Sequence, residues 1–236
     1  MKVAVISSAM AEGARIAVEI EKVSGVEAWI LVFKSRNMNP WMRLAREVYR
    51  FITTRSFFSA MRMAVRGRIR YFVKAIDDPA SIAKIKTFNF DLGVHSLNVI
   101  YRRPVIAAFG CGILNSHIGL LPGYRGRCVA EWSLLVGNPV GITVFFIDEG
   151  VDTGPEIILQ EKLSVAQFDS IAPMKAFLFG EDARMYSKAI GAIRAGHSRL
   201  PNCLSEGRRY YPMSKLFLNV VEELLQSSDR ASVRKT

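Results

Sequence analysis

The amino-acid sequence predicts an α/β protein with a mainly parallel β-sheet and helices on both faces. Short apolar runs rich in Val and Ile recur along the chain, and stretches with apolar residues at helical spacing lie between them. Strands that alternate with helices typically form a parallel sheet covered on both sides. With 236 residues, half of them apolar, the chain can fill one core but is too short for two full-sized domains.

The first elements are predicted to be a strand, a helix and a second strand. Residues 3–7 and 26–33 are the apolar runs, and between them Ile16, Ile20 and Val23 recur at helical spacing among charged side chains. This order predicts a β-α-β unit at the start of the sheet.

The alternation continues through the middle of the chain, where strands are predicted over 93–97, 112–116 and 141–148 and helices over 104–109 and 128–137. A strand over 156–165 and a long helix over 170–195 follow. Beyond residue 201 we predict one more helix, 214–226, and a polar end that frays. The chain therefore divides into a main domain, 1–196, and a partly helical C-terminal extension, 197–236.

Charge and cysteine content narrow the class of protein. The formal net charge is +11, which predicts attraction to phosphate-bearing partners such as nucleotides, nucleic acid or an anionic membrane face. Cys111, Cys128 and Cys203 have no metal-site spacing, so we expect reduced structural thiols and no metal. No apolar stretch approaches the ~20 residues that span a bilayer, and no signal-peptide cleavage site is seen. We expect a cytoplasmic protein.

Residues 41–74 stand apart because arginines interleave with aromatic side chains and Met. The arginines are Arg43, Arg46, Arg50, Arg55, Arg62, Arg66, Arg68 and Arg70. One interpretation is one or two helices over the sheet with solvated arginine faces. The other is an amphipathic surface that meets anionic lipid or a long phosphate-bearing substrate. Nucleic acid is not expected, because no repeated stacking motif or nucleic-acid module accompanies the arginines.

Polar side chains gather where two predicted strands end. An apolar strand ends in Asn115-Ser116-His117, and alternate residues of a strand share a face, so Asn115 and His117 are expected to project to one side. The next strand leads into a loop that carries Asp148 and Asp152. If the two strands are neighbours, Asp152 can approach His117.

The order and spacing of these residues resemble the formyltransferase family that uses 10-formyltetrahydrofolate. The resemblance covers about residues 90–163. It rests on Asn-x-His at 115–117, Leu-Leu-Pro at 120–122, Tyr-Arg-Gly at 124–126, Gly-x-Thr at 141–143 and Asp-x-Gly-x-Asp-x-Gly at 148–154. It implies a Rossmann-like fold, with residues 1–196 as the catalytic domain and folate as the co-substrate.

The resemblance assigns Asn115, His117 and Asp152 to the family's catalytic positions, and elementary chemistry agrees. Formyl transfer to an amine passes through a tetrahedral species with an oxyanion, which the Asn115 amide and His117 can stabilise by hydrogen bonds. A carboxylate beside His117 favours its protonated form and can position a water for proton relay.

The resemblance also implies which residues contact folate. Val99, Ile100 and Tyr101 match the segment whose backbone reads the pterin edge, and Asp148, Glu149, Gly150 and Val151 match the loop on the other side of that pocket. Arg127 matches an arginine near folate in amino-sugar formyltransferases. His95 and His197 are expected to have only structural or solvent-facing roles.

Three acceptors remain open: glycinamide ribonucleotide, methionyl-tRNA and a nucleotide-linked amino sugar. Residues 7–13 lack the Gly-x-Gly of a phosphate loop, and the chain after 196 lacks the repeated strand signals of a tRNA-binding β-domain. The Tyr-Arg-Gly-Arg run at 124–127 favours the amino sugar. The alternatives of another class are a noncatalytic folate- or nucleotide-binding protein and a membrane-surface scaffold. The oligomeric state is left open.

Overall fold

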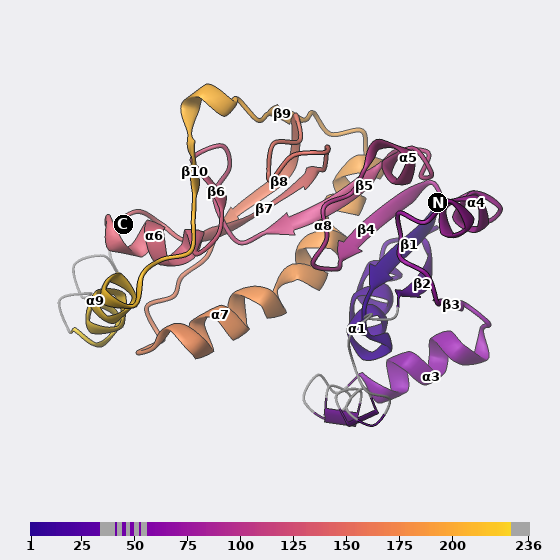
Figure 1. The fold of residues 1–236 in the computed structure, drawn as a ribbon, viewed down its shortest axis with the longest axis horizontal. Helices are drawn as coiled ribbons and strands as arrows, with labels where there is room; N and C mark the ends of the chain where they lie inside the picture. Colours follow the sequence, from indigo (N-terminus) through magenta and orange to yellow (C-terminus); the bar gives the residue numbers. More distant parts are fainter. Residues whose placement is uncertain (34–40, 42–43, 46–47, 50–51, 53–55, 228–236) are drawn as a thin grey trace.

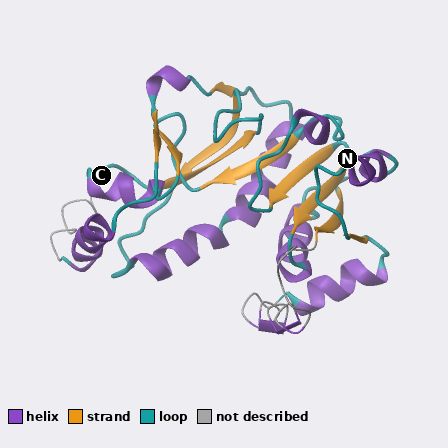
Figure 2. Cartoon of the chain, viewed as in Figure 1, coloured by secondary structure: helices purple, strands orange, loops and turns teal. Residues whose placement is uncertain are grey.

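The protein is built on one eight-stranded sheet with the strand order β3-β2-β1-β4-β5-β7-β8-β9 (Figures 1 and 2). The structure is a computed structural model. It describes residues 1–33, 41, 44–45, 48–49, 52 and 56–227, and the statements below concern these residues.

The first five strands of the sheet are parallel and the last three are antiparallel. The parallel strands are β1 (Lys2–Ser7), β2 (Glu27–Phe33), β3 (Ile69–Phe72), β4 (Leu92–Ser96) and β5 (Ile113–His117). The antiparallel strands are β7 (Gly141–Phe146), β8 (Glu156–Lys162) and β9 (Leu200–Pro201). β5, inside the sheet between β4 and β7, is therefore the strand at which parallel pairing changes to antiparallel pairing.

Both faces of the sheet are covered by helices, as the alternating pattern predicts. On one face lie α1 (Met10–Ile20), α3 (Phe57–Val65) and α8 (Asp182–Arg194), which share a core with Val3 and Val5 of β1. On the other face α4 (Pro79–Lys86) and α5 (Arg103–Ile106) share a core with Ala4 and Ile6. Successive β1 residues point to opposite faces, and both faces are apolar because both are buried.

A third, smaller core lies at the end of the molecule farthest from α3 (Figure 1). It joins α6 (Val129–Leu135), α7 (Ile171–Gly180) and α9 (Lys215–Gln226). Beside it, β6 (Tyr124–Gly126) pairs in parallel with β10 (Arg208–Tyr210), and η1 (Leu204–Glu206) precedes β10. β10 and α9, near the end of the chain, are therefore packed against β6, α6 and α7.

The predicted α/β class is confirmed, and two details differ from the prediction. The stretch 170–195 forms two helices, α7 and α8, instead of one. Arg15 explains the break, because its guanidinium donates to the Gly180 carbonyl at 2.9 Å and pairs with Asp182 at 2.5 Å. The extension also contains β9 and β10 besides the predicted helix, which is α9. The expected fraying of the final residues lies outside the described part of the chain.

Candidate active site

The site begins at the carboxyl end of β5, which carries Asn115 and His117. Only 7% of His117 is exposed. Its Nε2 lies 2.7 Å from the Tyr124 carbonyl oxygen and its Nδ1 lies 3.4 Å from Asp152 Oδ1. A carbonyl can only accept, so Nε2 carries a hydrogen and Nδ1 is the nitrogen that faces the carboxylate.

A buried hydroxyl organises the loop that follows His117. Thr143 Oγ1 donates to the Gly119 carbonyl at 2.6 Å and accepts from the Leu121 backbone N–H at 3.1 Å. Gln160 adds donors to the Leu121 carbonyl at 2.7 Å and to Thr143 at 3.0 Å. A Cβ at Gly119 would lie 2.6 Å from His117 Nε2, so only glycine allows this close passage of the backbone.

Asp152 reaches His117 by a different route from the one the sequence suggested. β7 is antiparallel to β5, and His117 lies opposite Thr143. The last residue of β7, Phe146, therefore lies beside Leu114, near the amino end of β5 and away from His117. The loop after β7 then turns back. Asp148 Oδ1 accepts from the Gly150 N–H at 2.9 Å and the Thr153 hydroxyl at 2.7 Å, which closes the turn. Strands β5 and β7 are neighbours, as the approach of Asp152 required.

Two contacts hold the Asp152 carboxylate loop in place. Asp152 Oδ2 accepts from the Gly126 backbone N–H at 2.9 Å. Asn202, in the C-terminal extension, donates to the Asp152 and Gly154 carbonyl oxygens at 3.2 and 2.9 Å. Asp152 itself has a φ of 55°, a conformation that aspartate tolerates better than most residues. Gly126 thus holds the Asp152 carboxylate, and Asn202 holds the backbone of the loop that carries it.

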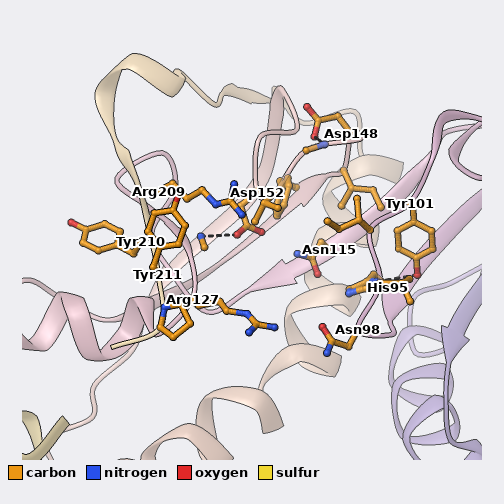
Figure 3. Close-up of a pocket in the computed structure, with 18 residues that line it drawn as sticks. His95, Asn98, Tyr101, Asn115, Arg127, Asp148, Asp152, Arg209, Tyr210 and Tyr211 are labelled. Carbon is orange, nitrogen blue, oxygen red and sulfur yellow. Dashed lines mark hydrogen bonds between the residues drawn. The ribbon is translucent and has the colours of Figure 1, made fainter. Parts of the chain in front are cut away.

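A cavity of about 570 Å³ lies beside these residues (Figure 3). Asn115 and Asp152 line it, and so do all but one of the residues expected to contact folate. These are Val99, Ile100, Tyr101, Arg127, Asp148, Gly150 and Val151. Glu149 is not among the lining residues, because its carboxylate turns toward α5 and accepts from the Arg103 backbone N–H at 3.0 Å.

Residues that the sequence analysis did not place in the site also line this cavity. His95 lies at its wall, where Nδ1 is 2.9 Å from the Tyr101 hydroxyl and burial lowers the pKa of His95 to about 4. The run Arg209–Pro212, which begins within β10 and continues past its end, forms another wall. Tyr210 stacks on Tyr124 at 5.2 Å between ring centroids. The basic-aromatic run at 208–211 was the sequence signal for this wall.

A second cavity of about 330 Å³ adjoins the first. Asn115, Gly126 and Arg127 line both cavities, whereas His117 lines only the second. The second cavity also contains Glu131, which is 2% exposed and pairs with Lys175 at 2.7 Å. The Asn115 amide, the Gly126 backbone and the Arg127 guanidinium therefore lie at the junction of the two cavities.

The junction depends on close contact between β6 and β10. Gly126 has a φ of 102°, and a Cβ there would lie 2.1 Å from the Tyr210 carbonyl oxygen. Only glycine allows β10 to approach and keeps the Gly126 N–H directed at Asp152. The buried Tyr186 fixes the opposite side, because its hydroxyl donates to the His95 carbonyl at 2.6 Å and accepts from the Ser116 N–H at 2.8 Å.

Fold and site together define a class of α/β protein with a ligand crevice at the carboxyl ends of parallel strands. An amide, an imidazole and a carboxylate lie at this crevice, and such groups can stabilise an oxyanion and transfer a proton. Residues 1–190 match the family model described as Formyl transferase. The chain belongs to this formyltransferase family.

Individual relatives agree with the family. The chain is 32% identical over 121 residues to a methionyl-tRNA formyltransferase of Thermodesulfovibrio yellowstonii, a match that covers 50% of this chain and 39% of that protein. The chain thus spans about two fifths of the length of this curated relative.

Solved structures share the fold. A sugar N-formyltransferase from a Shewanella species matches with a TM-score of 0.62 and 15% identity over 96% of this chain and 88% of that one. A formyltransferase from Anoxybacillus kamchatkensis, in complex with UDP-4,6-dideoxy-4-formamido-L-AltNAc and tetrahydrofolate, matches with a TM-score of 0.51 and 18% identity, over 89% of this chain and 85% of that one.

Proposed function

We propose that the chain transfers a formyl group from 10-formyltetrahydrofolate to a primary amine, and that the amine belongs to a nucleotide-linked amino sugar. The observation that carries the proposal is the meeting of two cavities at Asn115. A transferase must hold a donor and an acceptor on either side of the group that moves, and the shared wall offers that position.

The larger cavity suits the folate donor. A flat heterocycle needs backbone donors and acceptors along its edge, and the segments 99–101 and 148–151 line the cavity from opposite sides. Arg127 and Arg209 also line it, and they supply cations for the carboxylates of a glutamyl tail. The residues present therefore fit the co-substrate.

The smaller cavity suits the acceptor. Glu131 offers a buried carboxylate that can accept a hydrogen bond from the N–H of an incoming amine, and Lys175, whose side chain is 34% exposed, offers a cation for a phosphate. A carboxylate and a cation in one hollow match a nucleotide-linked amino sugar, which carries an amine and a phosphate.

The reaction needs an oxyanion donor and a path for one proton. The amine nitrogen attacks the formyl carbon, the bond from that carbon to the folate nitrogen breaks, and the proton lost by the amine goes to the departing nitrogen. Asn115 donates a hydrogen bond to the developing oxyanion. Asp152 and His117, whose Nδ1 lies 3.4 Å from the carboxylate, take part in the proton transfer directly or through a water.

Two observations favour the sugar over other acceptors. The turn before α1 contains Ser7, whose hydroxyl donates to the Ala9 carbonyl at 2.9 Å, and it has no glycines that would let a ribonucleotide phosphate approach the backbone. The solved relative with a bound formamido sugar and tetrahydrofolate supports the same choice. Methionyl-tRNA stays the second candidate because the curated relative carries that name.

Purified protein is incubated with 10-formyltetrahydrofolate and UDP- or dTDP-linked amino sugars, glycinamide ribonucleotide or methionyl-tRNA, and tetrahydrofolate release and product mass are followed. We expect turnover with an amino sugar. Turnover with only one of the other two amines would refute the acceptor, and no turnover with any amine, despite folate binding, would favour the noncatalytic alternative.

Substitutions at the junction test the assigned roles. Asn115→Ala and His117→Ala are each expected to lower kcat by about 100-fold, because each removes a group that acts in the transition state. The matched control is His197→Ala, since His197 is exposed and lies outside both cavities. Equal activity of His117→Ala and His197→Ala would remove His117 from the mechanism.

A further inference from the structure

The segment 41–74 carries most of the net charge of the chain. It contains nine cationic residues and one acid, Glu47, so it contributes +8 of the total of +11. The rest of the chain, about six times longer, supplies the other +3. Because like charges repel, such a concentration of charge is costly unless an anionic partner meets it.

Exposed apolar side chains lie on the same segment. On α3, Ala60 and Met63 face the core, whereas the opposite face carries Phe58 at 78% exposure, Met61 at 49% and Val65 at 83%. The spacing 58, 61, 65 makes one stripe along the helix. The stripe is not part of the core, because its side chains are exposed and lie on the helix face opposite the buried Ala60 and Met63.

The exposed apolar character extends beyond α3. Helical residues Leu44, Val48 and Ile52 are 57%, 49% and 72% exposed, and Val73 after β3 is 77% exposed. Arg43, Arg46, Arg50 and Arg55 lie outside the described residues. We call seven of the exposed apolar residues of this segment the apolar face; they are Leu44, Val48, Ile52, Phe58, Met61, Val65 and Val73. The aromatic residues Trp41, Tyr49, Phe57 and Tyr71 of the same segment are also exposed.

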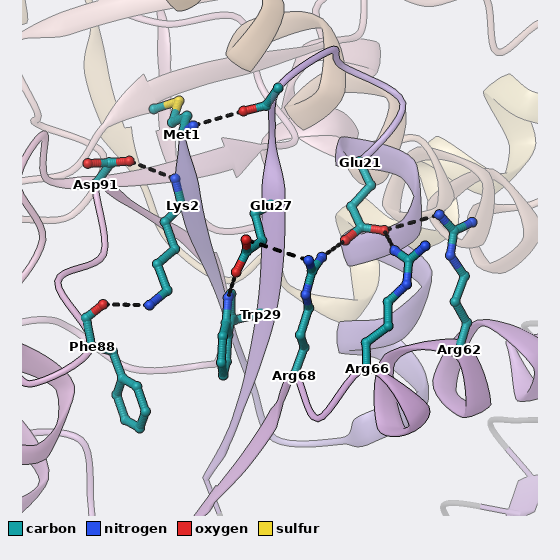
Figure 4. A network of polar contacts seen from close by, with 11 residues as sticks. Met1, Lys2, Glu21, Glu27, Trp29, Arg62, Arg66, Arg68, Phe88 and Asp91 are labelled. Carbon is teal, nitrogen blue, oxygen red and sulfur yellow. Dashed lines mark hydrogen bonds and ion pairs between the residues drawn. The ribbon is translucent and has the colours of Figure 1, made fainter.

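A cluster of arginines joins the end of α3 to Glu21, the residue that directly follows α1 (Figure 4). Glu21, whose side chain is 5% exposed, pairs with Arg62, Arg66 and Arg68 at 3.4, 2.9 and 2.6 Å. Arg68 also lies 3.5 Å from Glu27. Three cations thus face two carboxylates, so positive charge remains at the base of α3, where the Arg62 and Arg66 side chains are 49% and 42% exposed.

We propose that the apolar face docks on an anionic phospholipid surface, with the apolar side chains at the acyl boundary and Arg62 and Arg66 among the headgroups. This pairing of exposed apolar residues and cations is what an interfacial helix uses to bind lipid. Within the described residues no helix has the length and apolar character to cross a bilayer, so the contact is peripheral. The proposal is independent of the chemistry at Asn115.

The charge argues against a second copy of the chain as the occupant. In a symmetric dimer the same patch would meet itself and bring two segments of charge +8 together. A nucleic acid would satisfy the charge and could stack on exposed aromatic side chains such as Phe58. It would still leave Val65, Ile52 and Val73 without an apolar partner, because aliphatic side chains give bases no stacking surface. An anionic membrane satisfies both the charge and the apolar surface.

The test is vesicle flotation of the full chain. Vesicles of pure phosphatidylcholine and vesicles with about one third phosphatidylglycerol, the composition that supplies a negative surface potential, are compared. We expect co-flotation with the anionic vesicles only, and weaker binding as salt screens the arginines. Wild-type protein that stays in solution with anionic vesicles at low salt would overturn the proposal.

The variant Phe58→Gln/Val65→Gln locates the surface. Gln favours helix, so α3 is kept, and we expect at least a tenfold loss of vesicle binding with unchanged circular dichroism. The matched control Val136→Gln/Leu200→Gln replaces two apolar residues of 54% and 60% exposure elsewhere. Equal vesicle binding by both variants would place the contact elsewhere and refute this surface.

Two further measurements address the other occupants. Sedimentation of wild type and Phe58→Gln/Val65→Gln reports self-association, and a single-stranded oligonucleotide reports nucleic-acid binding. If the wild type does not bind anionic vesicles, the proposal is overturned. In that case a wild-type dimer that the substitutions dissociate would identify a second copy as the occupant, and oligonucleotide binding that they abolish would identify a nucleic acid. Formyl transfer to a soluble amine is expected to be unchanged in the same variant, which separates this test from the test of catalysis.

Discussion

His95 shows how a single residue can gain a role that its position in the sequence does not reveal. Its partner Tyr101 lies six residues further on, in the loop after β4, and the two meet only because this loop folds over the strand end. Burial then lowers the pKa of His95 to about 4 and raises that of Tyr101. A neutral imidazole at the cavity wall is therefore expected at neutral pH, where it can accept or donate one hydrogen bond.

This shift predicts a pH dependence of stability. The folded-state pKa of about 4 lies below the ordinary value of 6.5, so between these values the unfolded chain binds a proton that the folded chain does not. The contribution of His95 to the free energy of unfolding is present above pH 6.5 and falls by roughly 3 kcal/mol as pH drops to 4. Urea unfolding over this pH range measures it.

His95→Gln keeps a hydrogen-bonding side chain near Tyr101 but cannot titrate, so this part of the pH dependence is expected to vanish. His197→Gln is the control, because His197 is exposed and its replacement leaves the His95 contribution in place. Identical pH profiles for wild type and His95→Gln would show that His95 is not the titrating group.

At the level of elements, α3 is held by charge as well as by packing. Only Ala60 and Met63 of this helix are buried, so its apolar contribution is small. The Glu21 contacts described above supply the rest, and they join α1 to α3 and to the start of β3. The sequence shows the arginines, yet it does not show that one carboxylate from α1 gathers three of them.

Glu21→Gln is expected to loosen α3. It removes the charge that offsets three neighbouring guanidinium groups, and loss of a buried ion-pair partner lowers the free energy of unfolding by about 2 kcal/mol. Urea unfolding measures the loss, and faster hydrogen exchange within 57–65 localises it. Glu206→Gln, at an exposed position, is the control, and equal exchange in both variants would contradict the stabilising role.

Elements whose apolar residues share one period could be predicted from sequence, and those that depend on pairing partners could not. Strands β1, β2, β4 and β5 and helices α1, α6 and α9 follow their local patterns, whereas β3 lies within 41–74, where no strand is expected. β10 has three residues and two are exposed, so no alternation of buried and exposed residues predicts it. It forms a strand because it pairs with β6. The antiparallel direction of β7 likewise depends on β5 and β8.

For the molecule as a whole, the candidate site is assembled from segments that lie far apart in the sequence, between His95 and Pro212. The motif at 115–117 and the loop at 148–152 could be paired from sequence because their order and spacing resemble a known family. Asn202 could not, since an isolated asparagine has no pattern, yet it is 6% exposed and binds the loop that carries Asp152. The C-terminal extension is thus a structural part of the site.

Asn202→Ala tests this dependence on the extension. Two carbonyl oxygens lose their donor, which is expected to lower the free energy of unfolding by about 1–2 kcal/mol and to lower kcat more than it raises KM, because Asp152 loses its fixed position. Asn219→Ala, at an exposed position of α9, is the control. An unchanged kcat in Asn202→Ala would show that Gly126 alone suffices to hold Asp152.

The wall made by Arg209–Pro212 has a practical consequence for anyone who trims or splices this protein. The stretch that matches the family ends at residue 190, before that wall begins. A gene segment cut at the homology boundary would encode the α/β layers yet leave one side of the cavity open to water. The family match ends at residue 190, whereas the cavity wall extends to Pro212. An expressed segment should therefore include residues up to at least Pro212.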